Sequence, residues 1–207
     1  MTFDPRKPPT VGELDAAFAC DVVDEQGGTI PFGHLAMPEK GRVIVLFIRH
    51  FYCGLCMDFL SFLKARVSLE DLQRADVKLI VIGNGDYTMI KGYREMLELP
   101  FPVYTDADKK TYNALGMTRR TLDAGKFDKP PEYIIRGMFS NVVGSIKSAF
   151  KIGKLSSSSG DIRQIGGEFV FGPQKTVLYT HRMENTRGHA PINEIMDAAG
   201  VQFSDKT

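Results

Sequence analysis

The chain has few cysteines and almost no net charge. Its 207 residues include three cysteines, and 26 Lys and Arg are balanced by 25 Asp and Glu, which leaves a formal net charge of +1. Three cysteines are too few for the disulfide framework of a small secreted protein. A balanced charge gives no extended positive field, and the doublet Arg119-Arg120 is too small to form a phosphate-binding face. We therefore expect no nucleic-acid partner.

Long hydrophobic runs are also missing. No segment approaches the length of a membrane span, and residues 1–10 (MTFDPRKPPT) lack the apolar core of a secretory signal. The composition, 43% hydrophobic and 25% charged, suits a globular domain. The sequence predicts a cytoplasmic protein with no membrane partner, folded as a single domain over residues 1–207 with an insertion at residues 116–164.

Strand and helix patterns alternate along most of the chain. Strands are expected at residues 18–23, 29–32, 43–48, 77–82, 101–105, 168–171 and 176–181. Helices are expected at residues 54–72, 87–97, 109–115 and 191–199, the last ended by Gly200. The run 43–48 is continuously apolar, which is typical of a strand covered on both faces. This alternation predicts an α/β fold with a central mixed sheet flanked by helices.

Residues 116–164 interrupt the alternation. They contain a polar loop, a helical stretch and a run of serines at 156–159. One face of that helical stretch carries the apolar side chains of Met138, Val142, Ile146 and Ala149. A loop of this length is uncommon without a function, so the insertion is expected either to cover a substrate site or to pack on the sheet beside a flexible connection. A membrane-surface role for its helix is a third alternative.

Two of the cysteines form the motif Cys53-Gly54-Leu55-Cys56 at the start of an expected helix. Unpaired N–H groups and the positive end of the helix dipole favour the thiolate there, and the thiolate is the attacking form. Cys53 is expected to attack an oxidised substrate, and Cys56, one helical turn later, to close a disulfide. Arg49 and His50 directly precede the pair, and one of them is expected to supply positive charge or a proton.

Other candidate sites carry weaker signals. Zinc would need two more ligands near the dithiol, and His181 and His189 lack the tight spacing of a ligand pair, so we expect no metal and no cofactor. His181 is expected at a solvated hairpin end. The segment 83–86 (GNGD) lacks the third glycine of a dinucleotide loop, which favours a turn in which Asp86 caps the next helix. Cys20 is expected to be a small buried hydrophobic residue.

Two longer motifs carry a family resemblance. Residues 49–56 (RHFYCGLC) and 160–173 (GDIRQIGGEFVFGP) resemble the peroxiredoxin-like 2 group, the alkyl hydroperoxide reductase and thiol-specific antioxidant domain proteins of the thioredoxin-like superfamily. The resemblance covers residues 10–201. It implies a peroxiredoxin-type sheet and thiol-dependent reduction of a small-molecule peroxide or endoperoxide, recycled by a thiol reductant such as thioredoxin or glutathione. A homodimer is one expected assembly.

The chain departs from the ordinary peroxiredoxin pattern at the active site. Leu46 and His50 stand where peroxiredoxins have a proline and a hydroxyl residue that contacts the peroxide. His50 is therefore favoured over Arg49 as the group that reaches the site. Gly166 stands at the position of the peroxiredoxin arginine, and Arg163 lies just upstream. We expect Arg163 either to activate the thiolate in its place or to lie on the surface.

The same departures bear on the substrate. Without the hydroxyl residue and the arginine, bulky organic peroxides are expected to be preferred over hydrogen peroxide. The residues expected to bind the substrate are Phe51, Tyr52, Phe101 and Pro102. A disulfide reductase for protein partners and a non-catalytic redox-sensing module remain as alternatives, because both use the same cysteine motif.

Overall fold

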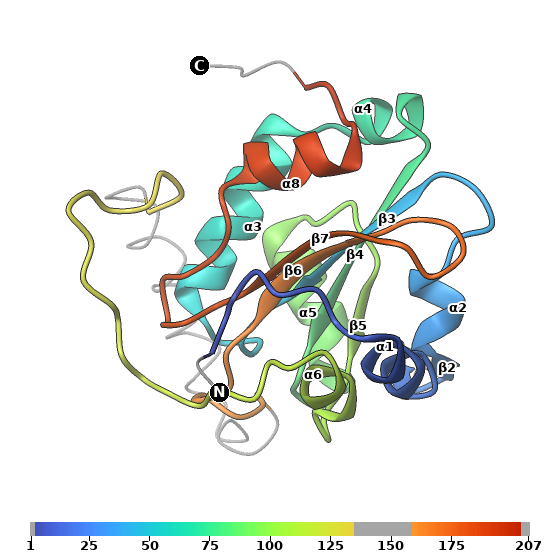
Figure 1. Ribbon diagram of the computed structural model, residues 1–207. Coiled ribbons are helices and arrows are strands. Elements are labelled where there is room, and N and C mark those ends of the chain that lie inside the picture. The colour runs from blue at the N-terminus through green and yellow to red at the C-terminus, as the bar shows by residue number, and fades with distance from the viewer. Residues whose placement is uncertain (1–2, 135–158, 204–207) are drawn as a thin grey trace.

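A mixed sheet organises the computed structural model, which describes residues 3–134 and 159–203 (Figure 1). In this part of the chain the sheet has seven strands in the order β2-β1-β5-β4-β3-β6-β7. The strands are β1 (Asp21–Val23), β2 (Thr29–Pro31), β3 (Arg42–Phe47), β4 (Val77–Gly83), β5 (Val103–Thr105), β6 (Gly167–Phe171) and β7 (Val177–Arg182). Strands β3, β4 and β5 run parallel, while β6 lies antiparallel to β3 and β7. The predicted mixed sheet is confirmed.

Helices cover both faces of this sheet. They are α1 (Val11–Phe18), α2 (Phe32–Ala36), α3 (Gly54–Arg66), α4 (Leu69–Arg74), α5 (Thr88–Leu97), α6 (Lys110–Ala114) and α8 (Ile192–Ala199). In β3, Ile44 and Leu46 belong to the core with α3, α5 and α8, whereas Val43 and Val45 face the core with α1, α2 and α6. Successive strand side chains point to opposite faces, so an entirely apolar strand is buried on both.

Two helical predictions need correction. The expected helix 54–72 is two helices, because Val67 is extended and Ser68 starts α4 with a capping box to Asp71. Helix α1 was not predicted, although Thr10 and Glu13 form a second capping box at its start.

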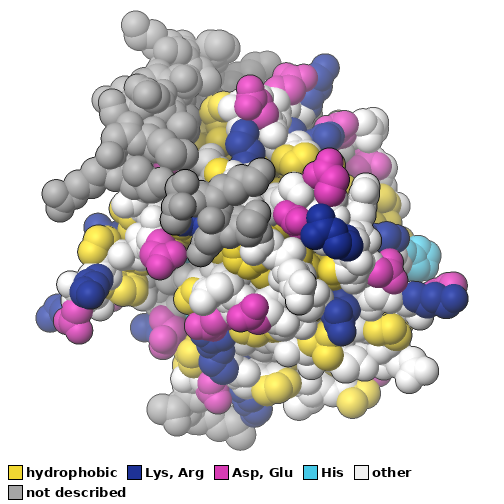
Figure 2. Space-filling model, turned by 90° about the horizontal axis from the view of Figure 1, so that it is seen from above, with side chains coloured by type: hydrophobic (Ala, Val, Ile, Leu, Met, Phe, Trp, Pro, Cys, Tyr) yellow, Lys and Arg dark blue, Asp and Glu magenta, His cyan; other side chains and the backbone are white. Residues whose placement is uncertain are grey.

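Within the described residues, the longest helices are too short or too polar to cross a membrane. On the face shown in Figure 2, acidic and basic side chains are interspersed.

The two described ends of the expected insertion lie side by side. Arg120 and Gln164 form an isolated antiparallel bridge, and the N–H of Thr121 donates to the carbonyl of Arg163 at 2.8 Å. The side-chain amide of Gln164 also donates to the carbonyl of Met117 at 2.7 Å. Residues 117–121 and 163–164 are therefore neighbours in the fold. The predicted helix with Met138, Val142, Ile146 and Ala149 lies outside the described residues.

Tyr112 of α6 joins the ends of the two central strands. Its buried hydroxyl lies 2.7 Å from the carbonyl oxygen of Ile48 and 2.9 Å from that of Ile82. The Ile82 carbonyl also accepts the N–H of Ile48 at 2.9 Å. The loop that follows Ile48 leads directly to the dithiol, so this hydroxyl fixes the edge of the sheet from which that loop departs.

Tyr112→Phe is expected to destabilise the fold by about 1–3 kcal/mol, because it leaves the Ile48 carbonyl buried without its donor. A shift of the urea midpoint with an unchanged slope would measure this loss. Tyr87→Phe, on an exposed ring, is the matched control. Equal midpoints for Tyr112→Phe and the wild type would contradict the role given to this hydroxyl.

Candidate active site

The dithiol lies at the start of α3, as the sequence predicts. Cys53 is the N-cap residue, and its Sγ accepts the backbone N–H of Cys56 at 3.3 Å. Both cysteines are reduced and buried, with 4% of Cys53 and none of Cys56 exposed. A sulfur that takes the place of an N-cap oxygen faces the free N–H groups of the helix start, and these favour its negative form.

The positively charged side chain of Arg49 lies beside the dithiol. Its Nη1 donates to Cys53 Sγ at 3.2 Å, and its Nη2 donates to the carbonyl of Ile162 at 2.7 Å. Its backbone N–H lies 3.4 Å from Cys56 Sγ. The guanidinium is thus held between the loop that carries the cysteines and the segment that precedes β6.

The two thiols differ strongly in acidity. Burial would raise the pKa of Cys53, but the hydrogen bond from Cys56 and the charge of Arg49 lower that pKa to about 6. Burial raises the pKa of Cys56 well above its ordinary value, and the neighbouring Cys53 raises it further. At neutral pH Cys53 therefore carries the thiolate and Cys56 keeps its proton.

Asn84 fixes the loop that positions Arg49. Its side-chain amide donates to the carbonyl of Arg49, and its Oδ1 accepts the N–H of Asp161 at 2.8 Å. Gly160, at φ +94°, lies so close to Asn84 that a Cβ would collide with it. The segment 83–86 is thus a turn, as predicted. Asp86 accepts the N–H of Thr88, the first residue of α5, at 2.9 Å, but the N-cap position of α5 is Tyr87 and not Asp86 as predicted.

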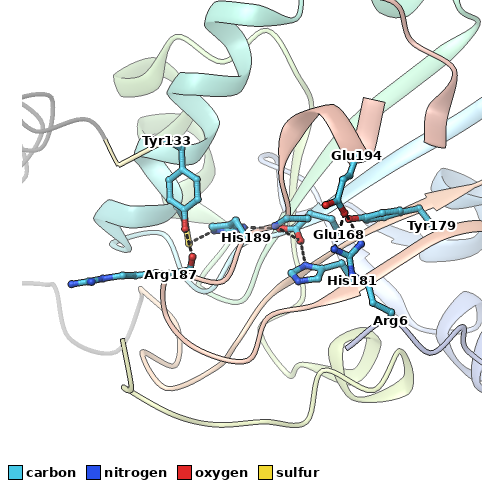
Figure 3. Close-up of polar contacts among 10 residues, drawn as sticks. Arg6, Tyr133, Glu168, Tyr179, His181, Arg187, His189 and Glu194 are labelled. Carbon is cyan, nitrogen blue, oxygen red and sulfur yellow. Dashed lines mark hydrogen bonds and ion pairs between the residues drawn. The ribbon is translucent and has the colours of Figure 1, made fainter. Parts of the chain in front are cut away.

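Cys56 also contacts a buried histidine, which in turn contacts a buried carboxylate, and the sequence did not reveal either as a partner. His189 Nε2 lies 3.3 Å from Cys56 Sγ, and His189 Nδ1 lies 2.6 Å from Glu168 Oε1. The other oxygen of Glu168 lies 2.6 Å from His181 Nδ1 (Figure 3). Burial alone would raise the pKa of Glu168, but the hydrogen bonds of His181 and His189 lower it to about 2. The one sequence signal was an acidic residue within the apolar strand 167–171.

His50 does not occupy the place that the sequence favoured for it. Its carbonyl accepts the N–H of Cys53 at 3.1 Å, but its ring Nδ1 is buried without a hydrogen-bond partner. Burial and the charge of Arg49 lower the pKa of His50 to about 4, so the ring is neutral at neutral pH. Since Arg49 is the residue that touches Cys53 Sγ, the preference for His50 over Arg49 is corrected.

Arg163 also lies elsewhere than the expected catalytic position. Its side chain is exposed, and its backbone makes turn contacts, the N–H donating to Asp161 Oδ1 at 3.0 Å. The guanidinium at Cys53 is that of Arg49, which is also bonded to the carbonyl of Ile162. Arg163 was expected either to activate the thiolate or to lie on the surface, and it lies on the surface.

The residues expected to bind substrate are separated in the fold. Phe51 is buried with its ring 5.2 Å from that of Tyr93, and the half-buried Tyr52 hydroxyl lies 3.6 Å from Met89 Sδ. Phe101 and Pro102 come before the first residue of β5, whereas the dithiol follows the last residue of β3. Because β3, β4 and β5 run parallel, Phe101 and Pro102 lie near the end of the strands opposite the dithiol. They line a separate cavity of about 330 Å³. Their expected place near the cysteines is corrected.

Three further expectations concern His181, Cys20 and metal binding. His181 lies within β7, on Glu168, and not at a solvated hairpin end. Cys20 is half-buried rather than buried, with its Sγ 3.1 Å from the carbonyl of Ala16. In residues 3–134 and 159–203, no cluster of three or more His, Cys, Asp or Glu side chains has a metal-binding arrangement.

Comparisons with known protein sequences show similarity to one family along most of the chain. The family described as AhpC/TSA antioxidant enzyme matches residues 63–185, which begin within α3 after the dithiol. The chain is 33% identical over 206 residues to peroxiredoxin-like 2C of Homo sapiens, with 98% of this chain and 88% of that protein covered. It is 26% identical over 188 residues to a chloroplastic thioredoxin-like protein of Arabidopsis thaliana, with 90% of this chain and 73% of that protein covered.

Solved structures give the same fold. The bacterioferritin comigratory protein of Xanthomonas campestris has a TM-score of 0.59 at 11% identity, with 94% of this chain and 95% of that chain covered. Peroxidoxin BcpB of Mycobacterium tuberculosis has a TM-score of 0.54 at 12% identity, with 96% and 94% covered. The thioredoxin-like, peroxiredoxin-type fold implied by the resemblance is confirmed.

Proposed function

The chain belongs to the AhpC/TSA antioxidant enzyme family, as a relative of the peroxiredoxin-like 2 proteins, and from this we propose that it reduces an organic peroxide or endoperoxide through a Cys53–Cys56 dithiol–disulfide cycle. The observation that carries the proposal is the contact between Arg49 and Cys53, in which Arg49 Nη1 lies 3.2 Å from Cys53 Sγ. The pKa of Cys53 is lowered to about 6. A second thiol, Cys56, follows one helical turn later.

The first step is attack by the Cys53 thiolate on one oxygen of the O–O bond. The O–O bond breaks, and the second oxygen leaves as an alkoxide that takes a proton from water to give the alcohol. With a hydroperoxide the attacked terminal oxygen stays on Cys53 as a sulfenic acid, and with an endoperoxide it stays bonded to carbon as a sulfenate ester, whose alcohol leaves in the second step in place of water. In both cases two electrons pass from the sulfur to the peroxide. The Nη1 hydrogens of Arg49 point at the sulfur and are placed to donate to the peroxide as it approaches.

The second step closes the disulfide. Cys56 Sγ attacks the sulfur of the Cys53 sulfenic acid, the S–O bond breaks, and the oxygen leaves as water after taking the Cys56 proton. A thiol reductant such as thioredoxin or glutathione then reopens the disulfide by exchange. The proposal includes a cytoplasmic location, where such reductants keep thiols reduced. A homodimer and a single domain over residues 1–207 stay predictions.

We expect organic peroxides to be preferred, because His50 stands where peroxiredoxins carry the hydroxyl residue that contacts the peroxide. The Xanthomonas campestris protein of the same fold was studied for alkyl peroxide reduction, which supports this class. The expected preference for cumene hydroperoxide over hydrogen peroxide is about tenfold in catalytic efficiency. Equal or better efficiency with hydrogen peroxide would contradict it.

Stopped-flow oxidation of the reduced protein tests both the reaction and this preference. The proposal expects one equivalent of peroxide to be consumed and a Cys53–Cys56 disulfide to form. An insulin disulfide assay separates the main alternative. Reduction of insulin without any oxidation of Cys53 by peroxides would identify a disulfide reductase instead.

A further inference from the structure

A continuous chain of hydrogen-bonding groups leads from Cys56 toward the surface. It runs from Cys56 Sγ to His189 Nε2 at 3.3 Å, from His189 Nδ1 to Glu168 at 2.6 Å, and from Glu168 to His181 Nδ1 at 2.6 Å. The His189 and Glu168 side chains are 1% and 0% exposed, whereas the His181 side chain is 13% exposed. Three elements meet in this chain, namely the start of α3, the β6–β7 pair and the loop before α8. We call it the Cys56 relay.

The carboxylate determines where the protons of the two rings lie. Glu168 is ionised, because the hydrogen bonds of both histidines lower its pKa to about 2. An ionised carboxylate only accepts hydrogen bonds, so His181 and His189 both carry a proton on Nδ1. A neutral His189 ring then has a free lone pair on Nε2, and that atom faces Cys56 Sγ. The relay therefore presents a base to the Cys56 thiol.

Contacts with two aromatic rings and with Glu168 hold the His189 ring in position. The ring stacks on Phe59 with centroids 4.2 Å apart and planes 3° apart, and Tyr133 packs edge-on at 5.8 Å. The neighbouring backbone N–H of Ala190 donates to Glu168 at 3.2 Å. A base held in this way loses little orientational freedom when it acts.

The second step of the proposed cycle needs such a base. Burial keeps Cys56 protonated at neutral pH, and a thiol attacks sulfur far more slowly than a thiolate. Once Cys53 has become a sulfenic acid its negative charge is gone, while the positive charge of Arg49 remains and lowers the pKa of Cys56. Removal of the Cys56 proton is then easier than in the fully reduced protein.

We propose, on the premise of the proposed function, that His189 removes the Cys56 proton as Cys56 attacks the Cys53 sulfenic acid, and that Glu168 and His181 are positioning residues for it. The S–S bond forms, the S–O bond breaks, and His189 passes the proton to the leaving hydroxide, which departs as water. When a reductant thiolate later attacks Cys53 Sγ, the S–S bond breaks and Cys56 leaves as a thiolate, which regains its proton from water.

The pH dependence of disulfide closing also depends on the charged and titratable groups that surround the relay. They are Cys53, Cys56 and Arg49 at the dithiol, Asp58 on α3, Tyr133 beside His189, and Arg6, Tyr179 and Glu194 near His181. Burial raises the pKa of both tyrosines, so they stay neutral in the working range. Burial raises the pKa of Asp58 to about 6, so Asp58 also changes charge near neutral pH. The pH dependence assigned to the relay is therefore the difference between the wild-type and His189→Gln profiles.

The test measures the lifetime of the sulfenic acid. Reduced protein is mixed with one equivalent of cumene hydroperoxide, quenched at intervals and analysed by mass spectrometry for Cys53 sulfenic acid and for the disulfide. In His189→Gln the disulfide is expected to form about 100-fold more slowly, with Cys53 sulfenic acid accumulating. The wild-type closing rate is expected to level off at a lower pH than that of His189→Gln, in which Cys56 must ionise without a base.

Two further variants separate chemistry from folding. His189→Gly with added imidazole is expected to recover part of the closing rate, because a cavity of about 540 Å³ reaches His189 from the surface. Glu168→Gln can accept from only one histidine, so the other must carry its proton on Nε2, and closing is expected to slow with a shifted pH profile. His34→Gln, at an exposed histidine on α2, is the matched control and should match the wild type.

The outcomes distinguish this inference from the function on which it rests. If Cys53 never forms a sulfenic acid in the wild type, the proposed function fails. If it does, but His189→Gln closes the disulfide at the wild-type rate with an unchanged pH profile, the relay is overturned and the cycle stands. If His189→Gln does not fold, the Glu168→Gln profile and the imidazole response decide the question, and no change in either rejects the relay.

Discussion

Cys53→Ser is expected to abolish peroxide turnover, with a loss on the order of 10⁴-fold or more, because the attacking atom itself is removed. Only the Cys53 sulfur combines a pKa of about 6 with contacts to Arg49 and to the helix start. Cys56→Ser should still consume about one equivalent of peroxide and then stop, since no second thiol can close the disulfide. Trapping and mass spectrometry of the sulfenic acid at Cys53 would measure this state.

Cys20 provides the control for that pair of variants. It is the third cysteine, half-buried, and burial raises its pKa. Cys20→Ser is therefore expected to keep full turnover. If the trapped label instead appeared on Cys56 in Cys53→Ser, with activity retained, the roles of the two cysteines would be reversed.

Arg49→Met is expected to slow oxidation of Cys53 by about 10- to 100-fold at neutral pH. The positive charge lowers the pKa of the Cys53 thiol, so its removal raises that pKa above about 6 and reduces the thiolate fraction. In the wild type the rate should rise with pH through about 6 and then level off. In Arg49→Met the same rise should occur at a higher pH. The pH dependence of Cys53 alkylation, resolved by mass spectrometry, measures both.

A lysine at this position separates charge from geometry. Arg49→Lys keeps the positive charge but replaces the fork that contacts Cys53 and the Ile162 carbonyl at once. It should restore much of the Cys53 acidity and less of the oxidation rate. Arg74→Met, at an exposed arginine of α4, is the matched control. An alkylation profile of Arg49→Met identical to that of the wild type would remove Arg49 from thiolate activation.

The sheet and the dithiol could be predicted because both have local signals. An apolar strand run and a cysteine pair before a helix need only neighbouring residues to be recognised. The Cys56 relay has no such signal, since His189 and Cys56 lie 133 positions apart and meet only through the pairing of β6 with β3. The one sequence signal of this relay was Glu168, an acidic residue within an apolar strand.

The choice between Arg49 and His50 illustrates a second limit. Both residues follow the last residue of β3, where the alternation of side-chain direction stops being regular. Arg49 is held by Asn84 and the Ile162 carbonyl, which lie in distant parts of the chain. Arg163 was assigned from its sequence position alone, and the backbone turn at Asp161 directs it to solvent instead.

The contacts between residues 159–162 and the dithiol loop make the two long motifs one inseparable unit. Ser159 accepts the N–H of Phe51 at 3.2 Å, and Ile162 accepts Arg49, so each motif completes the other. Transplanting residues 49–56 alone onto another thioredoxin-like scaffold would transfer both sulfurs but leave the guanidinium without its anchor. An engineered graft would have to carry both segments, together with Asn84 between them, to reproduce the acidity of Cys53.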